Sequence, residues 1–154
     1  MEQNRFARGA RVGLPLALAL ATSDTPTVSA HEDGPNACSN RTLRGAYGTA
    51  IDGTLLPPSP APSLLVRGVA RQHFDGHGNM SQVDYVTLNG APPSSDWRQS
   101  SGTYEVNADC TGTMETNFDD GRTLRQRLIV VDNGRQFLTV AEGGASGSTG
   151  TKVR

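Results

Sequence analysis

The most informative absences in this sequence concern charge, helical periodicity and long apolar segments. Fourteen basic and fifteen acidic side chains give a net charge of −1, so there is no basic excess. Proteins that bind nucleic acid or an anionic membrane surface carry such an excess, and we therefore expect neither partner. After about residue 40 helical periodicity is hard to find, and no apolar run reaches membrane-spanning length. These absences argue against a helical membrane protein and favour an all-β domain.

Catalytic and metal-binding motifs are also missing. There is no Gly-x-Ser-x-Gly sequence, which argues against a serine hydrolase although Ser, His and Asp are all present. His73 and His77 lie on either side of a glycine-rich turn with no third ligand nearby. The spacing of Asp75, His77 and Asn79 resembles part of a calcium loop but lacks its downstream bidentate carboxylate. We predict no metal site and no cofactor.

What is present begins with a segment typical of an export signal. MEQNRFARGAR is basic, VGLPLALALA is apolar but too short to span a bilayer, and Val28 and Ala30 are small residues suited to a cleavage site after position 30. We predict a signal peptide at 1–30 and a single domain at 31–154, secreted or periplasmic. That domain keeps 11 basic and 13 acidic side chains and has no second apolar segment long enough for a membrane span.

Cys38 and Cys110 are the two cysteines of the chain. An isolated pair in an exported protein is most simply a disulfide. A bridge that encloses so long a loop stabilises the fold by on the order of 4 kcal/mol in the chain-entropy model. The alternative, a reactive or metal-binding thiol pair, is not indicated, because the cysteines have no Cys-x-x-Cys spacing and no neighbouring histidine.

Short extended runs separated by turn signals occupy the rest of the chain. The proline-rich stretch at 55–63 predicts a loop, and Gly-, Asp- and Asn-containing turns at 75–79, 119–121 and 133–134 predict hairpins. The predicted strands are 43–51, 64–74, 80–89, 98–107, 110–118, 122–131, 135–142 and 151–154, with 143–150 as a loop. This pattern favours an eight-stranded antiparallel up-and-down β-barrel, because closure removes the sheet edges. An open sandwich is the alternative.

Three motifs carry a resemblance to a known group of proteins. They are CSNRTLRGAYG at 38–48, FDGHGN at 74–79 and GTYEVNADCTGT at 102–113. With these motifs the chain resembles a group of exported bacterial proteins of unassigned function, over nearly the whole length after the predicted signal. The resemblance implies a β-barrel similar in outline to lipocalins and to allene oxide cyclase-like proteins, with the two cysteines paired.

Candidate ligand-binding residues are those predicted to face the barrel interior. Tyr47 and Tyr104 fall on the small and apolar faces of their strands. There they would offer a ligand apolar surface and a hydroxyl, or serve as core residues whose hydroxyls bind the backbone. Trp97 follows a proline loop and is expected either to cover a barrel mouth or to pack as a partly exposed residue.

Gln126 is the third predicted ligand-binding residue. It shares a face with leucines and a valine, and a buried amide needs a partner, which ligands often provide. With the opposite face inward, Arg127 would be buried and would require an anionic ligand or a carboxylate such as Asp84 or Glu115. We favour Gln126. Only one of Asp84 and Tyr85 can face the interior, because successive residues of a strand point to opposite sides.

These features favour a secreted barrel that binds a small hydrophobic or amphipathic molecule. The second hypothesis is a cofactor-free isomerase or cyclase that encloses a small hydrophobic substrate, as allene oxide cyclase-like barrels do. A structural domain with a filled core is the third. The sequence specifies no oligomeric state.

Overall fold

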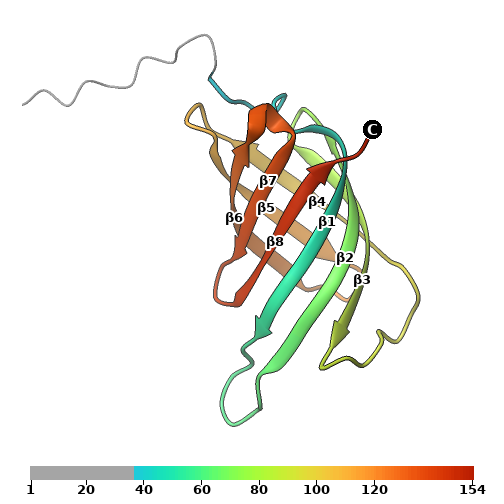
Figure 1. Cartoon of the computed structure of the whole chain (residues 1–154). Coiled ribbons are helices and arrows are strands. Elements are labelled where there is room, and N and C mark those ends of the chain that lie inside the picture. Colours follow the sequence, from blue (N-terminus) through green and yellow to red (C-terminus); the bar gives the residue numbers. More distant parts are fainter. Residues whose placement is uncertain (1–36) are drawn as a thin grey trace, which may run out of the picture. The chain divides into compact units, whose positions relative to one another are not determined.

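The computed structural model describes residues 37–154, which form one closed antiparallel barrel (Figure 1). Each strand pairs with its neighbours in the sequence, and the last strand pairs with the first. The strands are β1 (Arg44–Leu55), β2 (Leu64–Asp75), β3 (Asn79–Leu88), β4 (Arg98–Val106), β5 (Thr111–Phe118), β6 (Thr123–Val131), β7 (Gln136–Ala141) and β8 (Ala145–Lys152). The predicted eight-stranded up-and-down barrel is confirmed, and the open sandwich is not formed.

The predicted signal peptide at 1–30 lies outside the described residues. Within 37–154, no helix has both the length and the apolar character needed to cross a membrane.

Alternating burial along the strands separates the barrel interior from the outer face. In β2, Ala70, Gln72 and Phe74 are buried, whereas the residues between them are exposed. This follows from the strand geometry, in which successive side chains point to opposite faces. The interior of an eight-stranded barrel is just wide enough for packed side chains or one small ligand.

The connection between β6 and β7 differs from the predicted two-residue turn. Asp132, Asn133 and Gly134 form a short 3-10 turn, η1 (Asp132–Gly134), and have φ values of 51°, 52° and 79°. Positive φ is least unfavourable for Gly, Asn and Asp. The Asn-Gly dipeptide therefore marked the turn correctly, but the preceding aspartate also adopts the left-handed conformation.

The closing strand differs more strongly from the prediction. The glycine- and serine-rich stretch at 143–150, predicted as a loop, supplies most of β8, which pairs with β7 and with β1. A Cβ atom on Gly150 would lie 2.1 Å from the ring of Phe137, so this position requires glycine. Pairing on both sides overrides the low strand propensity of glycine and serine.

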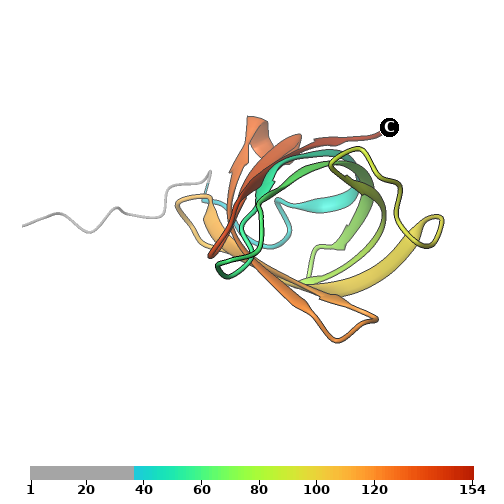
Figure 2. The ribbon, with the colours of Figure 1, turned by 90° about the horizontal axis from the view of Figure 1, so that it is seen from below.

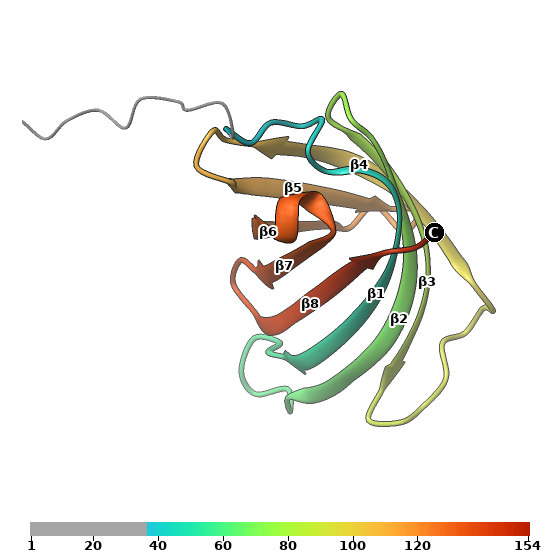
Figure 3. The same ribbon diagram turned by 45° about the horizontal axis from the view of Figure 1, so that its top comes forward.

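An aromatic cluster fills one end of the barrel, where η1 and the β4–β5 turn lie (Figure 1). Tyr47, Phe74, Tyr104 and Phe137 pack edge to face with ring centroids 5.0 to 5.4 Å apart. The predicted disulfide between Cys38 and Cys110 is present and packs against this cluster. Figure 3, in which this end is turned toward the viewer, shows η1 and the segment that leads into β1 at its rim. We call this the closed end.

The opposite end opens to solvent. Along β2 the inward residues are buried from Phe74 to Ala70, whereas Gly68 and Val66 are partly exposed. The same change occurs in β3 between Asp84 and Val86. The long loops at 56–63 and 89–97 lie at this end, which Figure 2 shows from below. We call it the mouth.

Candidate functional site

A layer of polar side chains lines the interior between the aromatic cluster and the mouth. Every strand contributes at least one member, and most of these side chains are buried. The polar layer consists of Thr49, Gln72, Gln82, Asp84, Ser100, Thr116, Gln126, Thr139 and Ser148. Burial of a polar group is unfavourable unless it is hydrogen-bonded, so the partners of these side chains decide what the layer does.

One chain of hydrogen bonds runs along the wall formed by β1, β2 and β3. The hydroxyl of Thr49 donates to Oε1 of Gln72 over 2.8 Å, and Nε2 of Gln72 donates to Oε1 of Gln82 over 2.8 Å. Nε2 of Gln82 then donates to Oδ2 of Asp84 over 2.7 Å. Three strands are thereby linked through their inward side chains.

This chain ends on a buried ion pair. Asp84 is only 1% exposed, and its Oδ1 lies 2.8 Å from both Nε and Nη2 of Arg98 on β4. The Arg98 side chain is 30% exposed toward the mouth, and its guanidinium lies 5.4 Å from the centroid of the Phe118 ring. A planar guanidinium suits both partners, because it binds carboxylates through several N–H groups and stacks on aromatic faces.

Tyr85 therefore faces outward, where its ring packs against Trp97 with centroids 6.0 Å apart. Trp97 is 54% exposed, which matches the second of the two roles expected for it, a partly exposed packing residue.

Gln126 faces the interior, as favoured from the sequence. Its Nε2 donates to the hydroxyl of Thr139 over 2.8 Å, and that hydroxyl lies 2.7 Å from the hydroxyl of Ser148. Arg127 points outward and pairs with Glu142 at 2.6 Å. The reversed arrangement, with Arg127 buried, is not formed.

Ser100 is the exception among the buried polar groups. Its hydroxyl oxygen is buried and has no hydrogen-bond partner within residues 37–154. Ser100 lies directly opposite Gln82 in the β3–β4 pair, beside the hydrogen-bond chain. A buried hydroxyl with no partner in the described residues marks a place where a further group can bind.

Tyr47 and Tyr104 face inward as predicted but lie in the aromatic cluster. The hydroxyl of Tyr47 donates to the carbonyl of Gly134. That of Tyr104 bonds to the carbonyl of Leu43 and accepts from the N–H of Gly76, both over 2.9 Å. Burial raises the pKa of Tyr47 to about 12 and also raises the pKa of Tyr104. Both hydroxyls thus hold turns of the closed end in place.

No family model, curated protein or solved structure matches this chain. The function is therefore inferred from the residues of the site.

The polar groups of the glycine-rich turn between β2 and β3 form hydrogen bonds with each other. The carboxylate of Asp75 accepts from the N–H groups of His77 and Asn79 over 2.6 and 3.0 Å, and from the Asn79 side chain over 2.7 Å. These bonds lower the pKa of Asp75 to about 2. His73 and His77 are exposed, and no group of three or more potential metal ligands occurs in the part of the chain that the structure describes.

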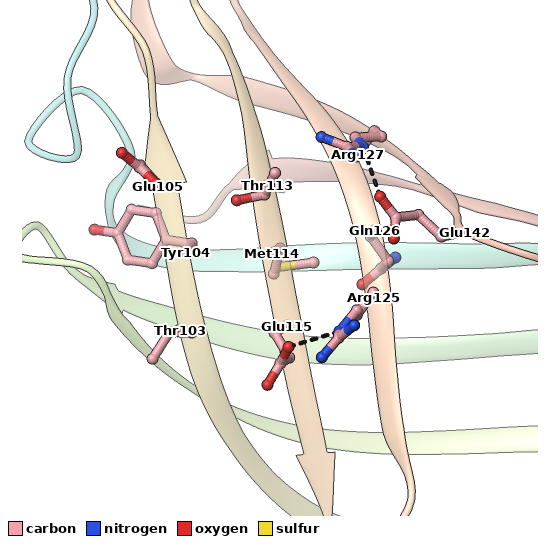
Figure 4. A pocket seen from close by; sticks show the side chains of 10 residues that line it. All are labelled: Thr103, Tyr104, Glu105, Thr113, Met114, Glu115, Arg125, Gln126, Arg127 and Glu142. Atoms are coloured by element: carbon pink, nitrogen blue, oxygen red, sulfur yellow. Dashed lines mark hydrogen bonds and ion pairs between the residues drawn. The ribbon is translucent and has the colours of Figure 1, made fainter.

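A groove of about 440 Å³ lies on the outer face of β4, β5 and β6 (Figure 4). Four of its five charged side chains pair with each other: Glu115 with Arg125 at 3.0 Å, and Arg127 with Glu142 at 2.6 Å. The fifth, Glu105, has no ion pair in the described residues. Exposed pairs of this kind contribute little, and they leave little unpaired charge for a ligand. Glu115 is accordingly a surface acid, and the polar layer is the stronger candidate site.

Gln72, Gln82 and Ser100 were not among the candidate residues identified from the sequence. The signal that could have found them is the period of two along the strands, since Gln72 lies two residues before inward-facing Phe74 and Gln82 two residues after Met80.

Proposed function

We propose that the protein binds a small amphipathic molecule inside the mouth half of the barrel. The observation that carries this proposal is the polar layer with the unpartnered hydroxyl of Ser100. A barrel interior that only packs is filled by apolar side chains, because buried polar groups gain little net stability from each other. A buried polar layer next to the open mouth of the barrel is therefore better explained by ligand binding than by packing alone.

The residues nearer the mouth indicate that the ligand is amphipathic. Here five inward side chains are apolar and only partly buried: Ile51, Val66, Val86, Phe118 and Leu124. They lie beside two polar inward side chains, Arg98 and Ser146. The rim adds exposed apolar residues, Leu55, Leu56, Leu65 and Leu88. A polar group at the polar layer and an apolar chain directed toward the mouth match this distribution.

We also infer that the protein works outside the cytoplasm. The disulfide between Cys38 and Cys110 is compatible with an oxidising compartment, and the predicted signal peptide would deliver the chain there. Membership of the exported bacterial group suggested by the three sequence motifs is part of the same proposal.

A second function is favoured by one observation, the buried carboxylate of Asp84 in the interior. A carboxylate in a site with limited access to water is a candidate proton acceptor, which a cofactor-free isomerase or cyclase would use. Incubation of the recovered ligand with the protein separates the two functions. An isomerase or cyclase changes the ligand's chromatographic composition, whereas a binding protein leaves it unchanged.

Native mass spectrometry of the protein from its own host tests the binding proposal. We expect a small molecule to copurify with the parent protein and its occupancy to fall at least tenfold in the Gln126→Leu variant. The matched control is Gln136→Leu, because Gln136 is exposed on the outer face of β7. Loss of ligand from the control alone, or a parent protein that carries and binds no small molecule, would contradict the proposal.

A further inference from the structure

Asp84 determines which way the amide groups of the polar layer point. A carboxylate only accepts hydrogen bonds, so Gln82 has to present its NH2 group to Asp84. The Oε1 atom of Gln82 then faces Gln72, which must present its own NH2 group. The Oε1 atom of Gln72 is left to accept from the hydroxyl of Thr49. One carboxylate therefore fixes the direction of the whole chain.

This direction leaves hydrogen-bond donors in the interior. Each glutamine NH2 group has two N–H donors, and the chain uses one from Gln72 and one from Gln82. The hydroxyl of Ser100 is a third donor with no partner in residues 37–154. Gln72 lies opposite Gln82, and Gln82 lies opposite Ser100, so the three donors form one row across β2, β3 and β4. Such neighbours are close enough to bind a single group.

The polar layer offers no free charge to a ligand. Among the inward positions of the eight described strands, the charged side chains are Asp84, Arg98 and Lys152. Asp84 and Arg98 pair with each other, whereas Lys152 is exposed and lies opposite Tyr47 at the closed end, away from the polar layer. A charged ligand group would therefore be buried without a counter-charge, which is strongly unfavourable.

We propose that the ligand binds through an uncharged carbonyl group, as in an amide, ketone or ester. Its oxygen accepts hydrogen bonds from the row formed by Gln72, Gln82 and Ser100. Asp84 is the positioning residue that sets this preference, since it turns the amide donors toward the interior and neutralises Arg98. This inference rests on the proposed function and specifies the chemical class of the ligand.

A series of probes with the same apolar chain tests the proposal at pH 7: octanamide, octanoate and octylamine. Isothermal titration calorimetry with the parent protein, in which the Cys38–Cys110 disulfide is intact, gives the three dissociation constants. We expect octanamide to bind at least tenfold more tightly than the anionic octanoate and the cationic octylamine. Equal or tighter binding of either charged probe would overturn the carbonyl assignment.

Variants of the donor row, formed by Gln72, Gln82 and Ser100, provide a second test of the carbonyl assignment. Ser100→Ala and Gln82→Leu should each weaken octanamide binding about fivefold to tenfold. Gln99→Leu is the matched control, because Gln99 is exposed on the outer face of β4 next to Ser100, and it should bind octanamide like the parent. Unchanged octanamide binding in both donor variants would contradict the assignment.

Asp84→Asn tests the positioning role through selectivity. This variant frees the glutamine amides to reverse and leaves Arg98 without its carboxylate, so the ratio of octanoate to octanamide affinity should rise at least tenfold. A general loss of structure would weaken all three probes together and leave that ratio unchanged. If Asp84→Asn does not fold, the donor-row variants and the probe series still test the carbonyl assignment.

The two proposals fail in different ways. If none of the three probes binds to the parent protein, the proposed function itself is contradicted. If the probes bind with no preference for octanamide, ligand binding stands and only the carbonyl assignment falls.

Discussion

At the scale of single residues, the two buried tyrosines show how much of a side chain's role depends on distant partners. The inward orientation of Tyr47 and Tyr104 followed from the alternation along their strands and is confirmed. Their hydroxyls bind the carbonyls of Gly134 and Leu43, which are 87 and 61 residues away in the sequence. No local pattern identifies such partners. The choice between a ligand-binding and a structural hydroxyl therefore required the folded chain.

Asp75 leads to a prediction about pH dependence. Its pKa is about 2 in the folded protein, because its carboxylate accepts hydrogen bonds from Asn79 and His77. In the unfolded chain it returns to about 3.9. A lowered pKa stabilises the fold above the unfolded value, and this contribution is lost as the pH falls through about 4 toward 2. We expect Asp75→Asn to be less stable than the parent at pH 7, with a difference that narrows below pH 4.

Urea denaturation monitored by circular dichroism between pH 2 and pH 7 measures this difference. The control is Asp119→Asn. Asp119 lies in the turn between β5 and β6, and its carboxylate makes no hydrogen bond or ion pair in residues 37–154. A gap between Asp75→Asn and the parent that stays constant with pH would contradict the assigned role of the Asp75 carboxylate.

At the scale of the elements, β8 is the strand that local sequence signals missed. Glycine and serine are depleted in strands, and this composition usually indicates a loop. Here β8 closes the barrel between β7 and β1, and Gly150 accommodates the buried ring of Phe137. The low strand propensity of glycine and serine is outweighed here by hydrogen-bonded pairing with β7 and β1 on both sides.

Gly150→Ala should therefore destabilise the protein. The added Cβ would lie 2.1 Å from the Phe137 ring, which is fully buried and packs against Tyr47 and Phe74. Overpacking of this kind lowers the free energy of unfolding by about 1 to 3 kcal/mol. Urea denaturation of the variant and the parent checks this value.

Gly48→Ala on β1 is the matched control. Its Cβ would lie 3.5 Å from the nearest atom of Val153, which is ordinary contact, and the position is exposed. We expect its stability to stay within about 0.5 kcal/mol of the parent. If Gly150→Ala is as stable as Gly48→Ala, the close packing assigned to β8 and Phe137 is wrong.

At the scale of the whole molecule, the barrel has two unlike ends. The closed end holds the aromatic cluster and the disulfide, whereas the mouth end holds the polar layer and the exposed apolar rim. Stability and ligand binding are therefore expected to depend on different residues, since the two sets are separated along the barrel axis.

Removal of the disulfide tests whether stability and ligand binding depend on different ends of the barrel. Cys38 and Cys110 are 72 residues apart, and the chain-entropy model gives a loop of that length about 4 kcal/mol of stabilisation. We expect a Cys38→Ser/Cys110→Ser variant to lose about this amount of unfolding free energy, measured by urea denaturation, and reduction of the parent to have the same effect.

The folded variant should bind octanamide with the affinity of the parent, because the bridge lies at the closed end. A parent whose denaturation midpoint does not change on reduction would contradict the stabilising role. A large loss of octanamide affinity in the folded variant would contradict the separation of the two ends.

The all-β class, the antiparallel order of the strands, the cysteine pair and the inward orientation of Tyr47, Tyr104 and Gln126 could all be predicted from the sequence. These features depend on turn chemistry and on the period of two along a strand, which act over a few residues. Three features became visible only in the folded barrel: β8 closes it, Asp84 pairs with Arg98 inside it, and the hydroxyl of Ser100 has no partner within residues 37–154. The physical reason is that closure and hydrogen bonding join groups from different strands, and their positions depend on the whole barrel being formed.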